Sequence, residues 1–204
     1  MGLNNDRITG AALILAAGLS VLMMAHHPSS AHDAALGQFV HGALIGLIAV
    51  TAWGFAHMAL RRGLDRPTVL AGLVAYATGV AATIGAATIN GFVVTALAAR
   101  GDIGRDVFLL AWESNQALAR LGVVAMGAGF ALWSIGWVRQ DGWPARALGA
   151  LGIAAGVVPI VLLLTGTLGM NLAGAILIYA MQSAWIALAG FYLWSGMFTR
   201  DLAG

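Results

Sequence analysis

Histidine is the residue type in this chain best suited to chemistry, and four of the five histidines fall in one short stretch. Neutral imidazole is a common transition-metal ligand, and a zinc-type site needs three or four ligands about 2.1 Å from the ion. The candidate ligands, with two carboxylates, are His26, His27, His32, His41, Asp33 and Glu113. We predict His27 and His41 as metal ligands and His26 and His32 as weaker candidates. The alternative is a solvated polar loop, because this spacing matches no established metal motif.

Other cofactors are restricted by what the chain lacks. The absence of cysteine excludes disulfides, iron–sulfur clusters and thiolate zinc sites. Haem is not expected, because His41 and His57 are about 24 Å apart along one helix and cannot share an iron. His26 or His27 could share one with His41, and that haem would lie at the outer surface. No histidine follows residue 57. The sequence does not identify a cofactor: a transition metal is compatible with these residues, and a quinone at the same end of the molecule stays open.

A second group of polar residues follows the spacing of one helix face. Glu113, Gln116 and Arg120 are three and four residues apart. We predict Glu113 and Arg120 as a catalytic pair, in which Arg120 binds an anionic group and Glu113 handles a proton. The alternative is a structural network in which Gln116 bridges the two charges. The predicted ligand-binding residues are Asn90, Asn115, Gln116 and Asn171.

The composition predicts the elements that must position these residues. The chain is 60% hydrophobic and 9% charged, whereas soluble domains carry about 25% charged residues. This excludes a soluble domain, a disordered chain and a nucleic-acid binder. Six segments are apolar enough to cross a bilayer, which predicts an all-α, polytopic transmembrane bundle in one domain over residues 1–204. The expected helices are 8–25, 38–60, 68–99, 107–138, 146–165 and 172–197.

Arginine placement predicts the orientation in a bacterial inner membrane. With a cytoplasmic amino terminus, seven of the ten arginines lie on the cytoplasmic side, as the positive-inside rule requires, and both termini are cytoplasmic. Five tryptophans then fall near the inner interface and are interpreted as anchors: Trp53, Trp133, Trp137, Trp143 and Trp194. A cleaved signal peptide is the alternative for the first segment, with Arg7 ahead of it and Ser29–Ala31 as the cleavage site.

The third and fourth segments are longer than a bilayer requires. Each has 32 residues, and so reaches about 48 Å as a helix. The excess predicts a helical hairpin that projects into the periplasm. The alternative is a fourth helix broken near Gln116. Gly152 and Gly156 form a small-residue step that favours close helix packing.

Three stretches carry a resemblance to a known group. They are His27-Pro28 with the later His41, TINGFVVTALAAR over Thr88–Arg100, and NQALARLGVVA over Asn115–Ala125. With these stretches the chain resembles uncharacterised bacterial inner-membrane proteins. The resemblance implies about six helices and no activity, and points to His27, His41, Asn90, Asn115, Gln116 and Arg120. An acidic residue often stands in that group where this chain has Asn90, and this departure weakens a proton-transfer role there.

These patterns lead to one main functional hypothesis and two alternatives. The main hypothesis is a membrane protein with a periplasm-side polar pocket for a metal ion or a small or lipophilic ligand, with membrane-embedded enzymes included. The first alternative is a structural or accessory subunit of a larger membrane complex, and the second is a small transporter. Gln182 is the main polar residue expected near the bilayer centre. Homo-oligomerisation and a membrane-complex partner are both compatible with the sequence.

Overall fold

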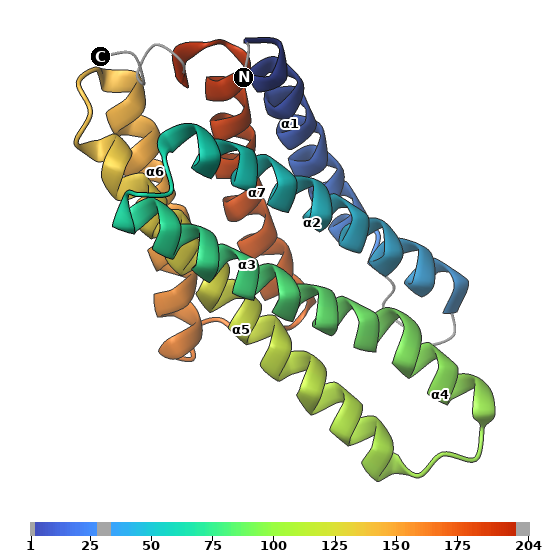
Figure 1. The fold of residues 1–204 in the computed structure, drawn as a ribbon. Helices are drawn as coiled ribbons and strands as arrows, with labels where there is room; N and C mark the ends of the chain where they lie inside the picture. Colours follow the sequence, from blue (N-terminus) through green and yellow to red (C-terminus); the bar gives the residue numbers. More distant parts are fainter. Residues whose placement is uncertain (1–2, 28–33, 199–204) are drawn as a thin grey trace.

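The computed structural model describes residues 3–27 and 34–198, and its regular elements are helical throughout these ranges. Six of the helical stretches are long and apolar enough to cross a membrane, which confirms the all-α transmembrane fold. The helices are α1 (Leu3–Ala25), α2 (Ala34–Arg62), α3 (Pro67–Thr88), α4 (Val94–Arg100), α5 (Arg105–Val138), α6 (Trp143–Leu164) and α7 (Leu172–Trp194). In Figure 1, α1 begins and α7 ends at the same end of the bundle, which we call the amino end.

The third span is not one continuous α-helix. A π-helical turn, η1 (Ile89–Val93), separates α3 from α4 and widens the helix where Asn90 and Gly91 lie. Such turns add one residue to a helical turn and shift the faces that follow it. In contrast, α5 runs without interruption past Gln116, so the alternative of a broken fourth helix is wrong.

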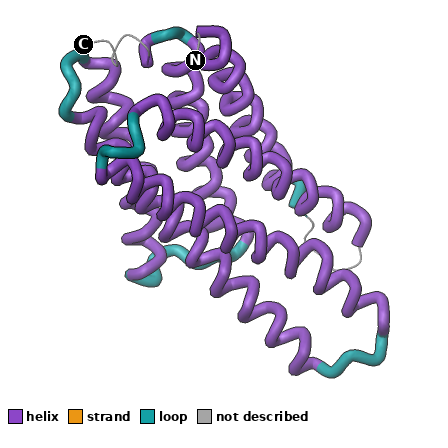
Figure 2. The backbone as a smooth tube through the Cα atoms, viewed as in Figure 1, coloured by secondary structure: helices purple, strands orange, loops and turns teal. Residues whose placement is uncertain are grey.

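Three helix pairs approach so closely that glycine is needed at the crossing. Gly10 of α1 lies against the backbone of Gly190 in α7, and Gly79 of α3 against the backbone of Gly122 in α5. Gly156 of α6 lies against the backbone of Gly127 in α5. The close helix packing expected at Gly152 and Gly156 is therefore confirmed. The α1–α7 pair and the α3–α5 pair form two sides of the bundle, as the tube view also shows (Figure 2).

Aromatic side chains fill the half of the bundle nearer the amino end. Phe55 stacks on Trp133 with ring centroids 4.8 Å apart, and Phe130 packs on Trp185 at 4.6 Å. The interface role expected for Trp133 and Trp137 is wrong, because both side chains are only 1% exposed. They lie on the face of α5 that is turned into the bundle. The other three tryptophans of that prediction, Trp53, Trp143 and Trp194, are exposed.

The hairpin formed by α4 and α5 reaches past the ends of α6 and α7 in Figure 1. The third span measures 34 residues from Pro67 to Arg100, and α5 also has 34. At 1.5 Å per residue each is about 51 Å long, well beyond the hydrocarbon thickness of about 30 Å. We call this the hairpin end of the bundle. Its periplasmic location remains a prediction.

Candidate functional site

A large cavity lies between the two tightly packed helix pairs. Its volume is about 770 Å³, and α1, α2, α5, α7 and the α3–η1–α4 span all contribute to its wall. Aliphatic and aromatic side chains form most of the lining, and a few polar groups interrupt it. Volumes of about 300–1,000 Å³ with this kind of lining are typical of small-molecule sites.

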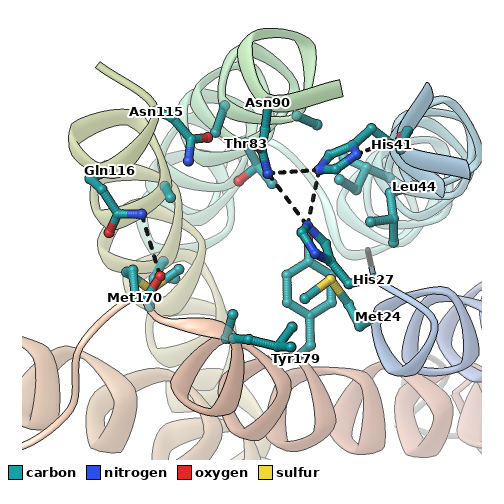
Figure 3. A pocket seen from close by; sticks show the side chains of 18 of the residues that line it. Met24, His27, His41, Leu44, Thr83, Asn90, Asn115, Gln116, Met170 and Tyr179 are labelled. Carbon is teal, nitrogen blue, oxygen red and sulfur yellow. Dashed lines mark hydrogen bonds between the residues drawn. The ribbon is translucent and has the colours of Figure 1, made fainter. Parts of the chain in front are cut away.

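Two histidines and an asparagine meet at one wall of this cavity (Figure 3). The Nε2 atoms of His27 and His41 are 3.2 Å apart. The Asn90 side-chain nitrogen lies 3.1 Å from Nε2 of His41 and 3.4 Å from Nε2 of His27. The two imidazole rings are nearly perpendicular, at 76°, with centroids 4.8 Å apart. Three nitrogen atoms therefore converge, from α2, from η1 and from the residue pair that follows α1.

Local structure determines how these side chains are aimed. Nδ1 of His41 lies 2.7 Å from the carbonyl oxygen of Gly37, one turn earlier in α2. Because a carbonyl only accepts hydrogen bonds, Nδ1 carries the proton, and Nε2 of the neutral ring presents its lone pair to the cluster. Gly91 in η1 lets His41 approach, since a Cβ there would collide with the Cβ and Cγ atoms of His41. The π-helical turn thus brings Asn90 to the histidine pair.

Predicted polar residues also occupy the α5 side of the cavity. Asn115 lines the cavity and is 9% exposed. The Gln116 side-chain amide donates to the carbonyl of Met170 at 3.4 Å, which joins α5 to the segment before α7. Asn171 lines the cavity too, but its Oδ1 accepts from the backbone N–H of Gly174 and caps the start of α7. Its contact is that of a helix cap.

A third polar group lies on α7. Tyr179, Gln182 and Ser183 all line the cavity. Gln182 is 7% exposed, and its side-chain nitrogen is buried with no hydrogen-bond partner among the described residues. A buried donor without a partner costs about 1–3 kcal/mol, so this amide is suited to a ligand or a water. The position of Gln182 near the bilayer centre remains a prediction.

The predicted catalytic pair lies outside the cavity wall. Glu113 and Arg120 are exposed and do not line the cavity, although they are on the same helix as Asn115. Within residues 3–27 and 34–198 neither makes a hydrogen bond or ion pair, and Gln116 contacts Met170 rather than bridging them. His26 is exposed and donates to the carbonyl of its own helix at Leu22. His32 and Asp33 lie outside the described residues.

The sequence did not predict a buried charged cluster that lies at the amino end of the bundle. Asp6 of α1 is fully buried and contacts Nε2 of His57 at 2.8 Å and the guanidinium of Arg61 at 3.1 Å. The sequence placed all three residues at the same membrane side, and that shared depth was the available signal. Because the cluster joins α1 to α2 and lies far along α2 from His41, it is a structural contact separate from the cavity.

Comparison with known proteins indicates that the chain is a membrane protein and indicates no activity. No protein-family model matches the chain, and no solved structure matches it. An alignment 109 positions long, which covers 49% of the chain, is 36% identical to the uncharacterized membrane protein Rv3479 of Mycobacterium tuberculosis (strain ATCC 25618 / H37Rv). The match covers 10% of that longer protein. The chain is thus an integral membrane protein similar to an uncharacterised bacterial one.

Proposed function

We propose that this protein binds a small, largely apolar ligand inside the membrane, in the cavity between its two helix pairs. The observation that carries the proposal is the cavity itself, with a volume of about 770 Å³ and a mostly apolar lining. Its polar groups are grouped rather than scattered. His27, His41 and Asn90 meet at one wall, and the α7 amide of Gln182 is buried without a protein partner.

The lining also limits the charge of the ligand. Arg105 is the one lining residue with a permanent charge in the described part of the chain, and it is exposed at the start of α5. Burying an unpaired charge is costly in a low-dielectric site. A neutral molecule with an apolar body and a polar end therefore fits best. Glu113 and Arg120 remain predicted catalytic residues, and the binding proposal does not depend on them.

The proposed location is the bacterial inner membrane, with both termini in the cytoplasm and the cavity nearer the periplasm. The arginine distribution supports this orientation. In that orientation the hairpin end, where α4 and α5 meet, faces the periplasm. The histidine pair then lies near the periplasmic membrane boundary, where a ligand can enter from the outer leaflet.

The test uses a small apolar photoprobe, a trifluoromethyl-phenyl-diazirine, on protein in native membranes. Met126 and Gln182 are 8% and 7% exposed and both line the cavity. Lipid alone does not reach them, so labelling at these residues reports entry into the cavity. We expect labelling of both in the wild type and its loss when Ala119→Trp and Ala175→Trp together fill the cavity.

The matched control is Ala117→Trp with Ala173→Trp. These positions lie two residues earlier on the same helices, are exposed and do not line the cavity. This variant should label like the wild type at Met126 and Gln182. No labelling at either residue in the wild type, or equal labelling in the filled variant, overturns the proposal. Labelling of exposed Leu151 and Leu188 confirms that the probe entered the membrane.

An accessory role in a larger membrane assembly is the second candidate. It is supported by the match to a segment that makes up 10% of a much longer membrane protein. A partner helix would then occupy the cavity in place of a small ligand. Purification in mild detergent separates the candidates, because a stoichiometric protein partner supports this one and a partner-free chain with cavity labelling supports the ligand site.

A further inference from the structure

The histidine pair has the spacing of two ligands on one metal ion. Two donors about 2.0–2.1 Å from a tetrahedral ion are about 3.3 Å from each other. The Nε2 atoms of His27 and His41 are 3.2 Å apart. The distance is therefore that of a ligand pair, and both Nε2 atoms lie next to the Asn90 side chain (Figure 3).

One lone pair of the cluster is assigned, and two further nitrogen atoms lie close to it. Nε2 of His41 presents a single lone pair, because Nδ1 donates to Gly37. The nitrogens of His27 and Asn90 both lie within 3.2 Å of that atom. A cation at the centre would receive a lone pair from Nε2 of each neutral imidazole, and the Asn90 amide can flip to offer its oxygen.

The second contact of His41 is the one that metal-binding histidines usually have. A ligating imidazole commonly donates its other N–H to a carbonyl or carboxylate, which fixes the tautomer and ring orientation. The 2.7 Å contact with the Gly37 carbonyl meets this requirement. It does not depend on the ligand occupying the cavity, and it holds the ring in place within α2.

The donor set selects the class of metal. Among the described residues there is no group of three or more His, Cys, Asp and Glu side chains that could hold an ion, so the set is two imidazoles and one amide. Imidazole suits zinc, copper, nickel and cobalt, whereas magnesium and calcium require oxygen ligands. With three protein ligands, one coordination position stays open, as in catalytic zinc sites.

We infer that His27, His41 and Asn90 bind a late first-row transition-metal ion, and that the polar end of the cavity ligand occupies its open position. The inference rests on the proposed ligand cavity, because all three residues line it. In this inference the cavity ligand is held by a divalent ion, which is bound by two Nε2 atoms and the Asn90 oxygen. A ligand with a neutral oxygen or nitrogen donor would complete the coordination.

The test is titration of chelator-treated protein with Co²⁺, followed by visible absorption. Tetrahedral Co²⁺ absorbs far more strongly than the hydrated ion, and excess Zn²⁺ should bleach the bands. We expect one Co²⁺ per chain in the wild type and loss of the bands in His27→Ala and in His41→Ala. Absence of bands in the wild type, or their survival in both variants, overturns the inference.

Two further variants show whether a loss of the Co²⁺ bands reflects loss of a ligand or a failure to fold. His26→Ala removes the adjacent, exposed histidine and should leave the bands unchanged. Asn90→Asp replaces the amide with a carboxylate, a negatively charged ligand that such ions also use, and should tighten Co²⁺ binding. A structural role for Asn90 predicts no such gain. Unchanged or weaker binding in Asn90→Asp counts against Asn90 as a ligand.

The experiments distinguish failure of the metal site from failure of the ligand cavity. Photolabelling of Met126 and Gln182 needs no metal, so chelated protein that is labelled there but binds no Co²⁺ retains the ligand cavity and loses the metal centre. Protein that binds Co²⁺ through His27 and His41, but is labelled equally in the cavity-filled variant, retains the metal centre and loses the cavity ligand.

Discussion

His27, His41 and Asn90 come from separate stretches of sequence, and their nitrogen atoms meet within 3.4 Å. The sequence singled out all three, because polar groups are scarce in this chain and these three were predicted at one membrane depth. Depth does not specify the face of a helix. For that reason the sequence also selected Glu113, which points away from the cavity, and assigned the buried Trp133 to the interface.

The buried charges at the amino end give a prediction at this scale. Asp6→Ala removes the acceptor of both His57 and Arg61 and leaves a guanidinium charge with less compensation inside the bundle. We expect the free energy of unfolding to fall by about 3–5 kcal/mol, as when one partner of a buried ion pair is removed. Thermal unfolding in detergent, followed by circular dichroism, measures it.

The matched control for this prediction is Asp141→Ala. Asp141 pairs with Arg146 at 3.2 Å, but both side chains are exposed, and solvent screens such pairs. Its unfolding temperature should not change measurably. If Asp6→Ala unfolds like the wild type and like Asp141→Ala, the buried cluster does not hold α1 to α2.

At the scale of elements, the spans follow from apolar runs of about 20 residues, and all six were predictable. The π-helical turn at Ile89–Val93 was not, because one added residue barely changes the apolar pattern of a span that is apolar on most sides. The turn coincides with a tertiary contact, in which Gly91 packs against His41 of α2. The element that brings Asn90 to the site therefore lies at a contact between helices.

A single methyl group tests this contact. In Gly91→Ala the new Cβ would press on the Cβ atom of His41 and lie 2.8 Å from its Cγ. Overpacking of this kind costs about 1–3 kcal/mol, so we expect a lower unfolding temperature and loss of Co²⁺ binding. Gly46→Ala on α2 is the control, because nothing lies within 4 Å of its added Cβ. Wild-type Co²⁺ binding in Gly91→Ala would contradict the packing account.

At the scale of the whole molecule, arginine placement predicts the orientation, and helix packing specifies where the cavity forms. Close glycine contacts join α1 to α7 and α3 to α5, while the space between the two pairs stays open. Composition predicted a bundle, but not which helices pair, because small residues occur in almost every span. The cavity therefore became visible only with the three-dimensional arrangement.

The natural absence of cysteine allows a direct test of orientation. Asp102→Cys lies between α4 and α5, and Asp141→Cys lies between α5 and α6; both positions are exposed. In intact cells a membrane-impermeant maleimide should label Asp102→Cys, and should label Asp141→Cys only after permeabilisation. The opposite pattern would place the cavity nearer the cytoplasm and contradict the proposed orientation.

Native mass spectrometry of the protein released from its own membranes tests the central claim most directly, because it weighs what the cavity holds. The wild type and the control Ala117→Trp with Ala173→Trp should retain one organic adduct. Ala119→Trp with Ala175→Trp, which fills the cavity from α5 and α7, should be free of it. An adduct-free wild type, or the same adduct on the filled variant, would contradict a ligand site in this cavity.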